Sequence, residues 1–404
     1  MNAESSKSQD LELLVQIGQV FRPSAPVDNR TTFAGRVDQL RSILSAVTQP
    51  GQHAVVYGER GVGKTSLVNI VSMMVEAVSV QSISVNCDSG DTFPTLWTKV
   101  FREIEFDTSV KRPGFLPGED VVRRSLVGYV NDTTGPEEIR LVLSRLGKRL
   151  VIVFDELDRI KDRGTTTLLA DTIKTLSDHS VDVTLVLVGV AESVSDLIAE
   201  HNSIERAVVQ IEMPRMSSHE LIELMNKALS ELKMTMPENE KHLIAKLAQG
   251  LPHYVHLICF HMAQFAVMDG RTDITSSDRE KGIAESVKHV QHSVASVHHK
   301  ATLTARRDTI YKEVLLACAL SETDDKGYFS AGSVREPLTR ITGRRYEIPA
   351  FARHLNEFST DSRGQILQKI GVSRRNRYRF TSPLMRPYLI LSGLTTNMIK
   401  AEDV

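Results

Sequence analysis

A run of eight residues, Gly58-Glu59-Arg60-Gly61-Val62-Gly63-Lys64-Thr65, matches the phosphate-binding pattern G-x-x-x-x-G-K-[ST] without a gap. Glycines in such a loop let backbone N–H groups turn inward around phosphate oxygens, and the N-terminus of the helix that follows adds its dipole. Lys64 is expected to bridge the β- and γ-phosphates of ATP, and Thr65 to hold Mg²⁺. The residues predicted to bind the nucleotide in this loop are Gly58, Gly61, Val62, Gly63, Lys64, Thr65 and Ser66.

Two adjacent acids, Asp155 and Glu156, follow the apolar run Leu150–Phe154. An acidic pair at the end of a buried strand suits metal-assisted hydrolysis, because one carboxylate can join the Mg²⁺ shell while the other polarises the attacking water. We predict that Asp155 is the metal ligand and Glu156 the catalytic base. We expect Asp158 to cap or solvate the helix that follows.

The elements around these motifs alternate between short β-branched runs and helix-length segments from about residue 36 to 213. Such alternation predicts an α/β domain built on a largely parallel, buried sheet. The predicted strands are His53–Tyr57, Val78–Val85, Leu150–Phe154, Val183–Val190 and Val208–Ile211. Residues 103–135, which contain two prolines and two glycines between 113 and 118, are expected to form an irregular insertion. We expect residues 1–20 to be a flexible leader and residues 21–213 to form the ATPase base.

The strands stop after Pro214, and helical spacing takes over. Capping boxes are predicted at Ser217/Glu220 and at Ser277/Glu280. Further helices are predicted over 238–249 and 253–269, so that residues 214–300 form a helical lid. Residues 301–404 read as a winged helix, which is three helices followed by a hairpin. The predicted elements of this domain are a helix over 306–320, a helix capped by Ser333 and Glu336, a helix containing Ile348 and Phe358, and strands over 365–370 and 375–380.

With these motifs the chain resembles the AAA+ and STAND class of P-loop ATPases, especially the branch of origin-recognition-type initiators. Phe33-Ala34-Gly35-Arg36 is similar to the F-x-G-R box of this class, which lies near the adenine. Val188–Glu192 falls on the strand that carries sensor 1, where Glu192 or Ser193 stands in place of the usual Asn or Thr.

The same resemblance implies two further site residues. Ile204-Glu205-Arg206 is similar to the box of the arginine finger, so Arg206 would reach the γ-phosphate of a neighbouring subunit and stabilise the transition state. Gly250-Leu251-Pro252-His253 occupies the position of sensor 2 and looks like the G-x-P motif of STAND switches. It adds Pro252 and His253 to the predicted nucleotide-binding residues and favours a slow switch over a fast motor.

The charge of the chain is unevenly distributed. The 404 residues hold 49 Lys and Arg against 50 Asp and Glu, a net charge of −1. Residues 335–386 hold twelve of the bases and four of the acids, a net charge of +8 that leaves −9 elsewhere. In Arg377-Tyr378-Arg379-Phe380 the two arginines fall on one face of a strand and the two rings on the other. The candidates for nucleic-acid contact are Arg353, Arg374, Arg375, Arg377 and Arg379. Such a surface can contact DNA, dock a protein, or fold back on the acidic remainder of the chain.

Composition and spacing exclude several other classes. Cys87, Cys259 and Cys318 are far apart and form no C-x-x-C pair, which fits a reducing compartment. The polar first ten residues do not read as a signal peptide, and Val183–Ala191 is too short to span a bilayer, so we predict a cytoplasmic protein with no membrane contact. His289 and His292 have no further ligand at suitable spacing and read as a polar helix face rather than a metal site.

Two functions from different classes remain. The first is a DNA-associated ATPase switch, in which a neighbouring subunit of a homo-oligomer completes hydrolysis and the nucleotide state repositions a winged helix on double-stranded DNA. The second is a STAND-type signalling or scaffold ATPase that oligomerises on ATP and recruits a protein effector, for example in an antiphage module. A small-molecule kinase shares the phosphate loop but does not account for the helical lid or the basic C-terminal segment.

Overall fold

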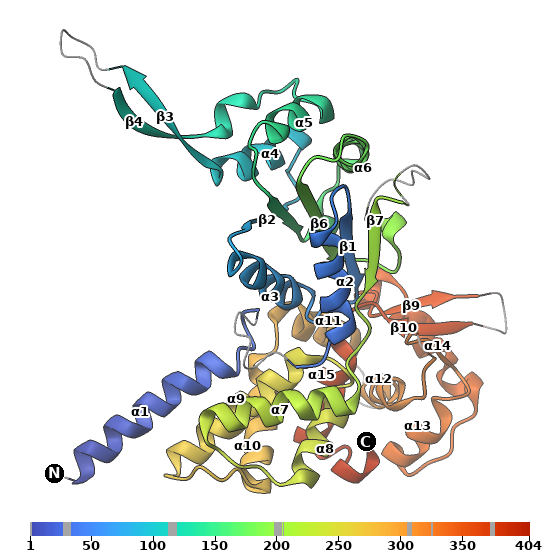
Figure 1. The fold of residues 1–404 in the computed structure, drawn as a ribbon. Helices are drawn as coiled ribbons and strands as arrows, with labels where there is room; N and C mark the ends of the chain where they lie inside the picture. The colour runs from blue at the N-terminus through green and yellow to red at the C-terminus, as the bar shows by residue number, and fades with distance from the viewer. Residues whose placement is uncertain are drawn as a thin grey trace.

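The computed structural model describes residues 2–26, 34–111, 119–197, 204, 206–304, 309–324, 326–371 and 376–404, with the side chains of 2–9 and 107–124 left out. The N-terminal residues are helical, whereas we expect a flexible leader from the sequence. Residues Asn2–Val20 form helix α1, which extends away from the body of the molecule (Figure 1). Ile17 and Val20 of this helix are buried against the core, so apolar packing holds its C-terminal half in place.

A five-stranded sheet forms the base, as the alternating pattern predicts. Its order is β2-β5-β6-β1-β7, and every neighbouring pair is parallel. The strands are β1 (His53–Gly58), β2 (Gln81–Asn86), β5 (Leu150–Asp155), β6 (Val183–Val190) and β7 (Val208–Glu212). Because all five run the same way, the ends of β1 and β5 that carry the two motifs meet at one edge of the sheet.

Helices cover both faces of this sheet (Figure 1), which makes the base an α/β domain. They are α2 (Val37–Thr48), α3 (Lys64–Glu76), α4 (Phe93–Arg102), α5 (Pro136–Ser144) and α6 (Arg163–Asp178). The expected irregular insertion is instead partly an antiparallel hairpin, β3 (Glu105–Lys111) and β4 (Glu119–Ser125), which projects from the base. Two seven-residue strands on either side of a Pro/Gly-rich connection explain why composition alone did not predict it.

Four helices follow the base where the lid is predicted. They are α7 (Ser218–Leu232), α8 (Glu238–Leu247), α9 (Pro252–Met268) and α10 (Ser276–His289), and α11 (His292–Thr302) continues past residue 300. The Ser217/Glu220 capping box is confirmed, since each side chain bonds the backbone N–H of the other residue. The second box is not Ser277/Glu280 but Thr275 with Asp278, whose carboxylate accepts the Thr275 N–H.

The C-terminal elements follow the predicted order with an added strand and helix. They are α12 (Tyr311–Leu320), β8 (Phe329–Ser330), α13 (Arg335–Thr342), α14 (Ile348–Phe358), β9 (Leu367–Ile370), β10 (Arg377–Phe380) and α15 (Met385–Thr395). The three strands pair antiparallel in the order β8-β10-β9. The predicted Ser333/Glu336 cap does not form, because Ser333 bonds Ser330 and Glu336 pairs with Arg340.

Two hydrophobic cores lie on opposite faces of the sheet. One contains Val55 and Ile152 with the buried side chains of α4, α5 and α6. The other contains Val56 and Val153, and it runs without interruption through the lid helices into α12, α14 and α15. The lid and the C-terminal elements therefore share one core, which ties them mechanically to each other and to one face of the sheet.

Candidate nucleotide-binding site

The phosphate loop joins the end of β1 to the start of α3, as the motif predicts. Gly61 and Gly63 have φ values of 87° and 96°, in the left-handed region that glycine tolerates best. Gly58 has no room for a side chain, because a Cβ there would lie 2.5 Å from the Met213 carbonyl oxygen. The Lys64 Nζ donates hydrogen bonds to the carbonyl oxygens of Gly58 (2.9 Å) and Glu59 (2.8 Å). The Lys64 side chain thus reaches back to the backbone of its own loop.

The two predicted magnesium ligands lie side by side. The Thr65 hydroxyl donates a 2.7 Å hydrogen bond to Oδ2 of Asp155, and Oδ1 of Asp155 accepts the N–H of Glu156. Burial raises the pKa of Asp155 and lowers that of Lys64 to about 8. A hydroxyl and a carboxylate are the hard oxygen donors that Mg²⁺ prefers, so these residues fit the ion that the motif implies.

Glu156 lies at the mouth of the same pocket in a left-handed conformation, with φ 55°. Its carboxylate pairs with Arg159, three residues on, at 2.7 Å. Both side chains are about half exposed, so this ion pair is weak and easily exchanged. Glu156 therefore lies next to the predicted metal ligands but is held by a neighbouring arginine.

The expectation for Asp158 is wrong. The cap of α6 is Asp162, which accepts the N–H groups of Gly164 and Thr165. Asp158 instead lines the pocket and accepts the N–H of Val190 at 2.7 Å. It therefore connects the turn after β5 to the end of β6.

The pocket itself has a volume of about 790 Å³, within the range of small-molecule sites. Val62, Gly63, Lys64, Thr65 and Ser66 form one wall, as predicted. Pro252 and His253 at the start of α9 line it from the lid side. The pocket thus brings together the predicted residues from the base and the lid. Gly58 is the exception, because it does not line the pocket and packs against Met213 instead.

Three lining residues were not predicted as ligands from the sequence. Arg36 is buried and donates to the carbonyl oxygens of Val62 in the phosphate loop and Pro214 at the start of the lid. His256 accepts the N–H of Arg22 through Nδ1, and burial lowers its pKa to about 4, so its ring is neutral. Ala34 belongs to the F-x-G-R box, whose Phe33 lies outside the described residues. The F-x-G-R box is the sequence signal that could have identified Arg36 as a lining residue. No sequence pattern marks His256, whose position in the pocket is evident only from the fold.

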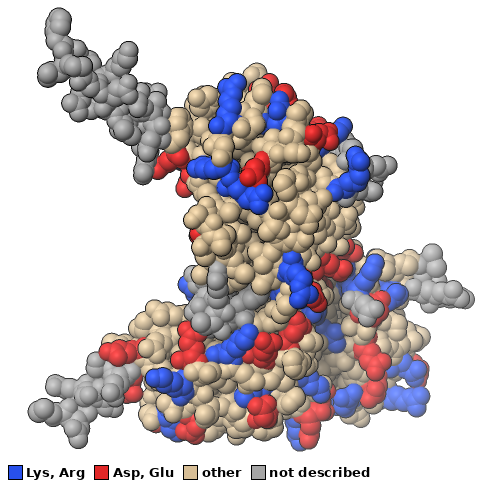
Figure 2. All heavy atoms as spheres, viewed as in Figure 1, with Lys and Arg blue, Asp and Glu red and all other residues tan. Residues whose placement is uncertain are grey.

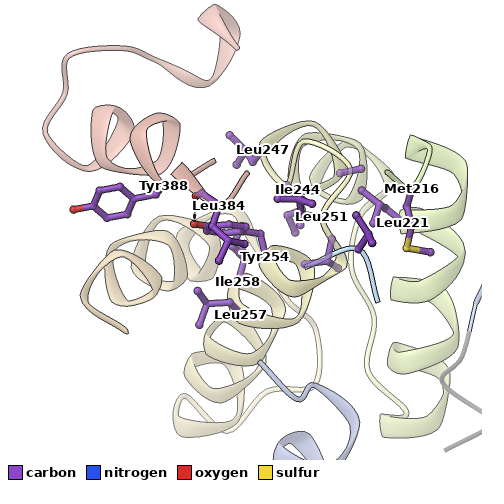
Figure 3. Close-up of a cluster of buried hydrophobic side chains, with 14 of the residues drawn as sticks. Met216, Leu221, Ile244, Leu247, Leu251, Tyr254, Leu257, Ile258, Leu384 and Tyr388 are labelled. Carbon is purple, nitrogen blue, oxygen red and sulfur yellow. Dashed lines mark hydrogen bonds between the residues drawn. The ribbon is translucent and has the colours of Figure 1, made fainter. Parts of the chain in front are cut away.

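The C-terminal segment contacts the phosphate loop. Leu384, immediately before α15, packs on the phosphate loop, since a Cβ on Gly61 would lie 3.1 Å from its Cδ2. The Tyr254 hydroxyl of α9 donates a 2.6 Å hydrogen bond to the Leu384 carbonyl oxygen, and Figure 3 shows the two side by side in a buried apolar cluster. Phosphate loop, lid and C-terminal segment therefore meet at Leu384.

Arg206 lies far from this pocket in the same chain. It precedes β7, whose first residue pairs with His53 at the start of β1, whereas the phosphate loop follows the other end of β1. Its side chain is exposed. Sensor-1 candidates Glu192 and Ser193 also lie outside the pocket lining, although Gly189 and Val190 belong to it.

The arginines proposed for nucleic-acid contact differ in their surroundings. Arg353 on α14 is 82% exposed and pairs with Glu357, while Arg379 on β10 is 21% exposed. Arg377 pairs with Asp324, and Arg374 and Arg375 lie outside the described residues. The predicted alternation is confirmed, because Arg377 and Arg379 both lie over Tyr328 and the rings of Tyr378 and Phe380 both meet Phe329. On the face in Figure 2, basic and acidic side chains are interspersed rather than segregated.

Two further expectations concern sites outside the pocket. Within the described part of the chain, no group of three His, Cys, Asp or Glu side chains is arranged to hold a metal ion. His289 instead lies beside His261 and Glu285. The helices that the structure describes include none long and apolar enough to cross a membrane.

Comparisons with known proteins agree with this geometry. Residues 47–198 match the family model described as AAA domain. The ORC1-type DNA replication protein 1 of Archaeoglobus fulgidus is 26% identical over 141 residues, 33% of this chain and 30% of that protein. An ORC1-type DNA replication protein of Thermoplasma volcanium is 29% identical over 156 residues, 37% of this chain and 35% of that protein. The matches thus span about a third of the length of these relatives.

A solved structure extends the likeness along the chain. The Orc1 protein of Aeropyrum pernix, solved in complex with DNA, superposes with a TM-score of 0.50 at 18% identity, covering 94% of this chain and 97% of that one. This likeness concerns the fold. Residues 47–198 therefore resemble an AAA domain, and the chain shares its fold with this Orc1 structure; the α/β base carries a candidate nucleotide-binding site.

Proposed function

We propose that this chain is an ATP-binding and ATP-hydrolysing molecular switch that couples its nucleotide state to double-stranded DNA through a C-terminal winged helix. The observation that carries the proposal is the meeting of Lys64, Thr65 and Asp155 in one pocket, together with the packing of Leu384 of the C-terminal segment on Gly61 of the phosphate loop. The phosphate loop therefore contacts the C-terminal segment directly, so a shift of the loop on nucleotide binding would move the elements that engage DNA.

In this proposal each residue of the pocket has a separate task. Mg²⁺, when bound, neutralises the charge that develops on the phosphates. Thr65 and Asp155 hold that ion, and Lys64 leaves its two backbone acceptors to bind the β- and γ-phosphate oxygens. Glu156 exchanges Arg159 for the attacking water and accepts its proton.

Completion of the site requires a second copy of the chain. Arg206 lies at the edge of the sheet opposite the phosphate loop, so it cannot reach the nucleotide of its own subunit. Its exposed guanidinium is available to a neighbour, where it would stabilise transition-state charge. We therefore propose a homo-oligomer whose sites are completed between subunits, with hydrolysis slow in the isolated chain.

The DNA-facing part of the proposal rests on the order α12-β8-α13-α14-β9-β10, the plan of a winged helix. Arg353 projects from α14 into solvent, and Arg374 and Arg375 belong to the connection between β9 and β10. The relatives named as DNA replication proteins, and the solved neighbour bound to DNA, support the same partner. Phosphate contacts by such arginines would position the domain on the duplex.

The test is binding to duplex DNA across a salt series with ATP present. Affinity should fall steeply with salt because phosphate contacts release counterions, and each lost contact should reduce the slope by about 0.9. The quadruple change Arg353/Arg374/Arg375/Arg377→Ala should weaken binding strongly, and Arg353→Ala alone should weaken it more than the matched control Arg163→Ala on α6 of the base. Absence of binding at low salt with ATP would overturn the DNA part of this proposal.

A second candidate is a STAND-type signalling ATPase that assembles on ATP and recruits a protein effector. The observation in its favour is the lid motif, in which Pro252 follows Gly250 and lies against Gly63 of the phosphate loop, 3.9 Å from a Cβ built there. Mass measurement of ATP-loaded Glu156→Gln protein with and without DNA, combined with the DNA-binding assay and a search for co-purifying proteins, separates the two. The STAND-type function is supported if the protein assembles without DNA, has no affinity for DNA and co-purifies with another protein.

A further inference from the structure

The guanidinium of Arg379 on β10 lies in a cradle formed by a side-chain amide and an aromatic ring. Its Nε donates to Oε1 of Gln368 on β9 at 2.8 Å, which fixes the plane of the group. Its carbon lies 4.8 Å from the centre of the Tyr328 ring, and the neighbouring Arg377 lies 5.5 Å from the same ring. Asp324 is the acid that pairs with Arg377. Arginine planes held by an aromatic ring and a side-chain amide are well suited to a planar or tetrahedral oxyanion.

A carboxylate from the ATPase base occupies this cradle. Oε1 of Glu192 accepts a hydrogen bond from Nη2 of Arg379, across 187 residues of sequence. Glu192 follows the end of β6, while Arg379 belongs to the hairpin of the C-terminal elements. The pair therefore connects the base to the hairpin, and it covers Arg379, whose side chain is 21% exposed against 82% for Arg353.

The base side of this contact begins in the nucleotide pocket. Val190, two residues before Glu192, donates its N–H to Asp158, which lines the pocket beside the motif acids. Gly189 is pressed against the same turn, since a Cβ there would lie 3.2 Å from the Asp158 backbone nitrogen. A shift of the turn after β5 must therefore move the end of β6, and with it the loop that carries Glu192.

We propose that Arg379, with Arg377, Gln368 and Tyr328, is a binding site for a backbone phosphodiester of DNA, and that Glu192 fills this site as an internal substitute while the hairpin is docked on the base. This inference rests on the proposed function and names how its DNA-contacting surface is regulated. One guanidinium edge cannot serve both anions, so docking and DNA contact through Arg379 exclude each other. Movement of β6 on nucleotide exchange is the event that would release the site.

The test compares Glu192→Gln with the matched control Asp182→Asn. Both remove one negative charge, and the two positions flank the same strand: Asp182 precedes β6 and pairs with Arg149, away from the C-terminal elements. Duplex DNA affinity is measured across a salt series for wild type, both variants, Arg379→Gln and Glu192→Gln/Arg379→Gln. In parallel, spin labels on cysteines placed at the exposed Leu141 of α5 and Ile370 of β9 report the distance between base and hairpin. The native cysteines are buried.

Glu192→Gln should bind DNA about two- to fivefold more tightly than wild type, the range expected for one exposed ion pair. It should also lengthen the label distance without DNA, as DNA does in wild type. Asp182→Asn should change neither, and the double variant should lose the gain. A Glu192→Gln protein with wild-type DNA affinity, or with an unchanged label distance, overturns this inference while leaving the proposed function standing. Absence of DNA binding in every form overturns both.

Discussion

The hydroxyl of Tyr254 donates a hydrogen bond to the carbonyl oxygen of Leu384, 130 residues later in the chain. Tyr254 lies in the first turn of α9, next to Pro252 and His253 of the nucleotide pocket. Leu384 packs on Gly61 of the phosphate loop. This bond therefore joins the C-terminal segment to the lid beside the pocket (Figure 3).

Tyr254→Phe should weaken this junction while preserving its packing. The change removes the shorter of two hydrogen bonds to the buried Leu384 carbonyl, which keeps the Tyr388 N–H at 3.4 Å, and this costs about 1 kcal/mol. We expect the midpoint of thermal unfolding to fall by about 2–4 °C. Differential scanning calorimetry measures it, with Tyr388→Phe as the control, because the Tyr388 hydroxyl lies 3.4 Å from His298 Nδ1 and makes a weaker contact. Equal losses in the two variants would contradict a special role for the Leu384 bond.

The local motifs of the pocket could be predicted from the sequence. The phosphate loop and Asp155-Glu156 are contiguous runs that each end a buried strand, and parallel strands bring such ends to one edge. Leu384 and His256 could not be predicted as neighbours of the nucleotide, because their proximity depends on how the lid and the C-terminal elements pack in a shared core.

The errors in the fold have local physical causes. The polar first ten residues favour a flexible leader, whereas the helical spacing of Leu13, Ile17 and Val20 favours the helix α1 that forms. Ser277/Glu280 and Thr275/Asp278 both satisfy the pattern [ST]-x-x-[DE], so the local sequence predicts two registers for the N-terminal cap of α10. Choosing between them requires Arg271, which pairs with the buried Asp278 and so selects the second register.

Glu156→Gln should leave nucleotide affinity near the wild-type value and reduce ATP turnover by a factor of about 10²–10⁴, the usual contribution of a positioned general base. The amide keeps the shape of the side chain but cannot accept the proton of water. Arg159→Ala is the informative comparison, because it removes only the partner that holds Glu156 in an exposed pair. It should change turnover by less than about fivefold. Phosphate release and nucleotide titration measure both, and turnover that survives Glu156→Gln would exclude it as the base.

Nucleotide affinity should depend on pH through Lys64. Burial lowers the pKa of this lysine in the folded protein from 10.5 to about 8, so between these values the free pocket holds a neutral amine where the unfolded chain would hold an ammonium. Phosphate binding favours the charged form, so binding above pH 8 must take up a proton. The phosphate itself has finished its second ionisation below this range, with a pKa of about 6.

Two measurements follow from this linkage. Affinity should be about fivefold weaker at pH 9 than at pH 8, and calorimetry at pH 9 in buffers of different ionisation enthalpy should report uptake of about 0.9 proton for a pKa of about 8. Lys64→Arg is the matched variant, because a guanidinium stays charged throughout this range and its affinity should be independent of pH even if it is lower. Lys64→Ala should remove binding altogether. A wild-type affinity that does not change from pH 7 to pH 9, with no proton taken up, would show that Lys64 is already charged in the free pocket. Burial would then not lower the pKa of Lys64 into this range.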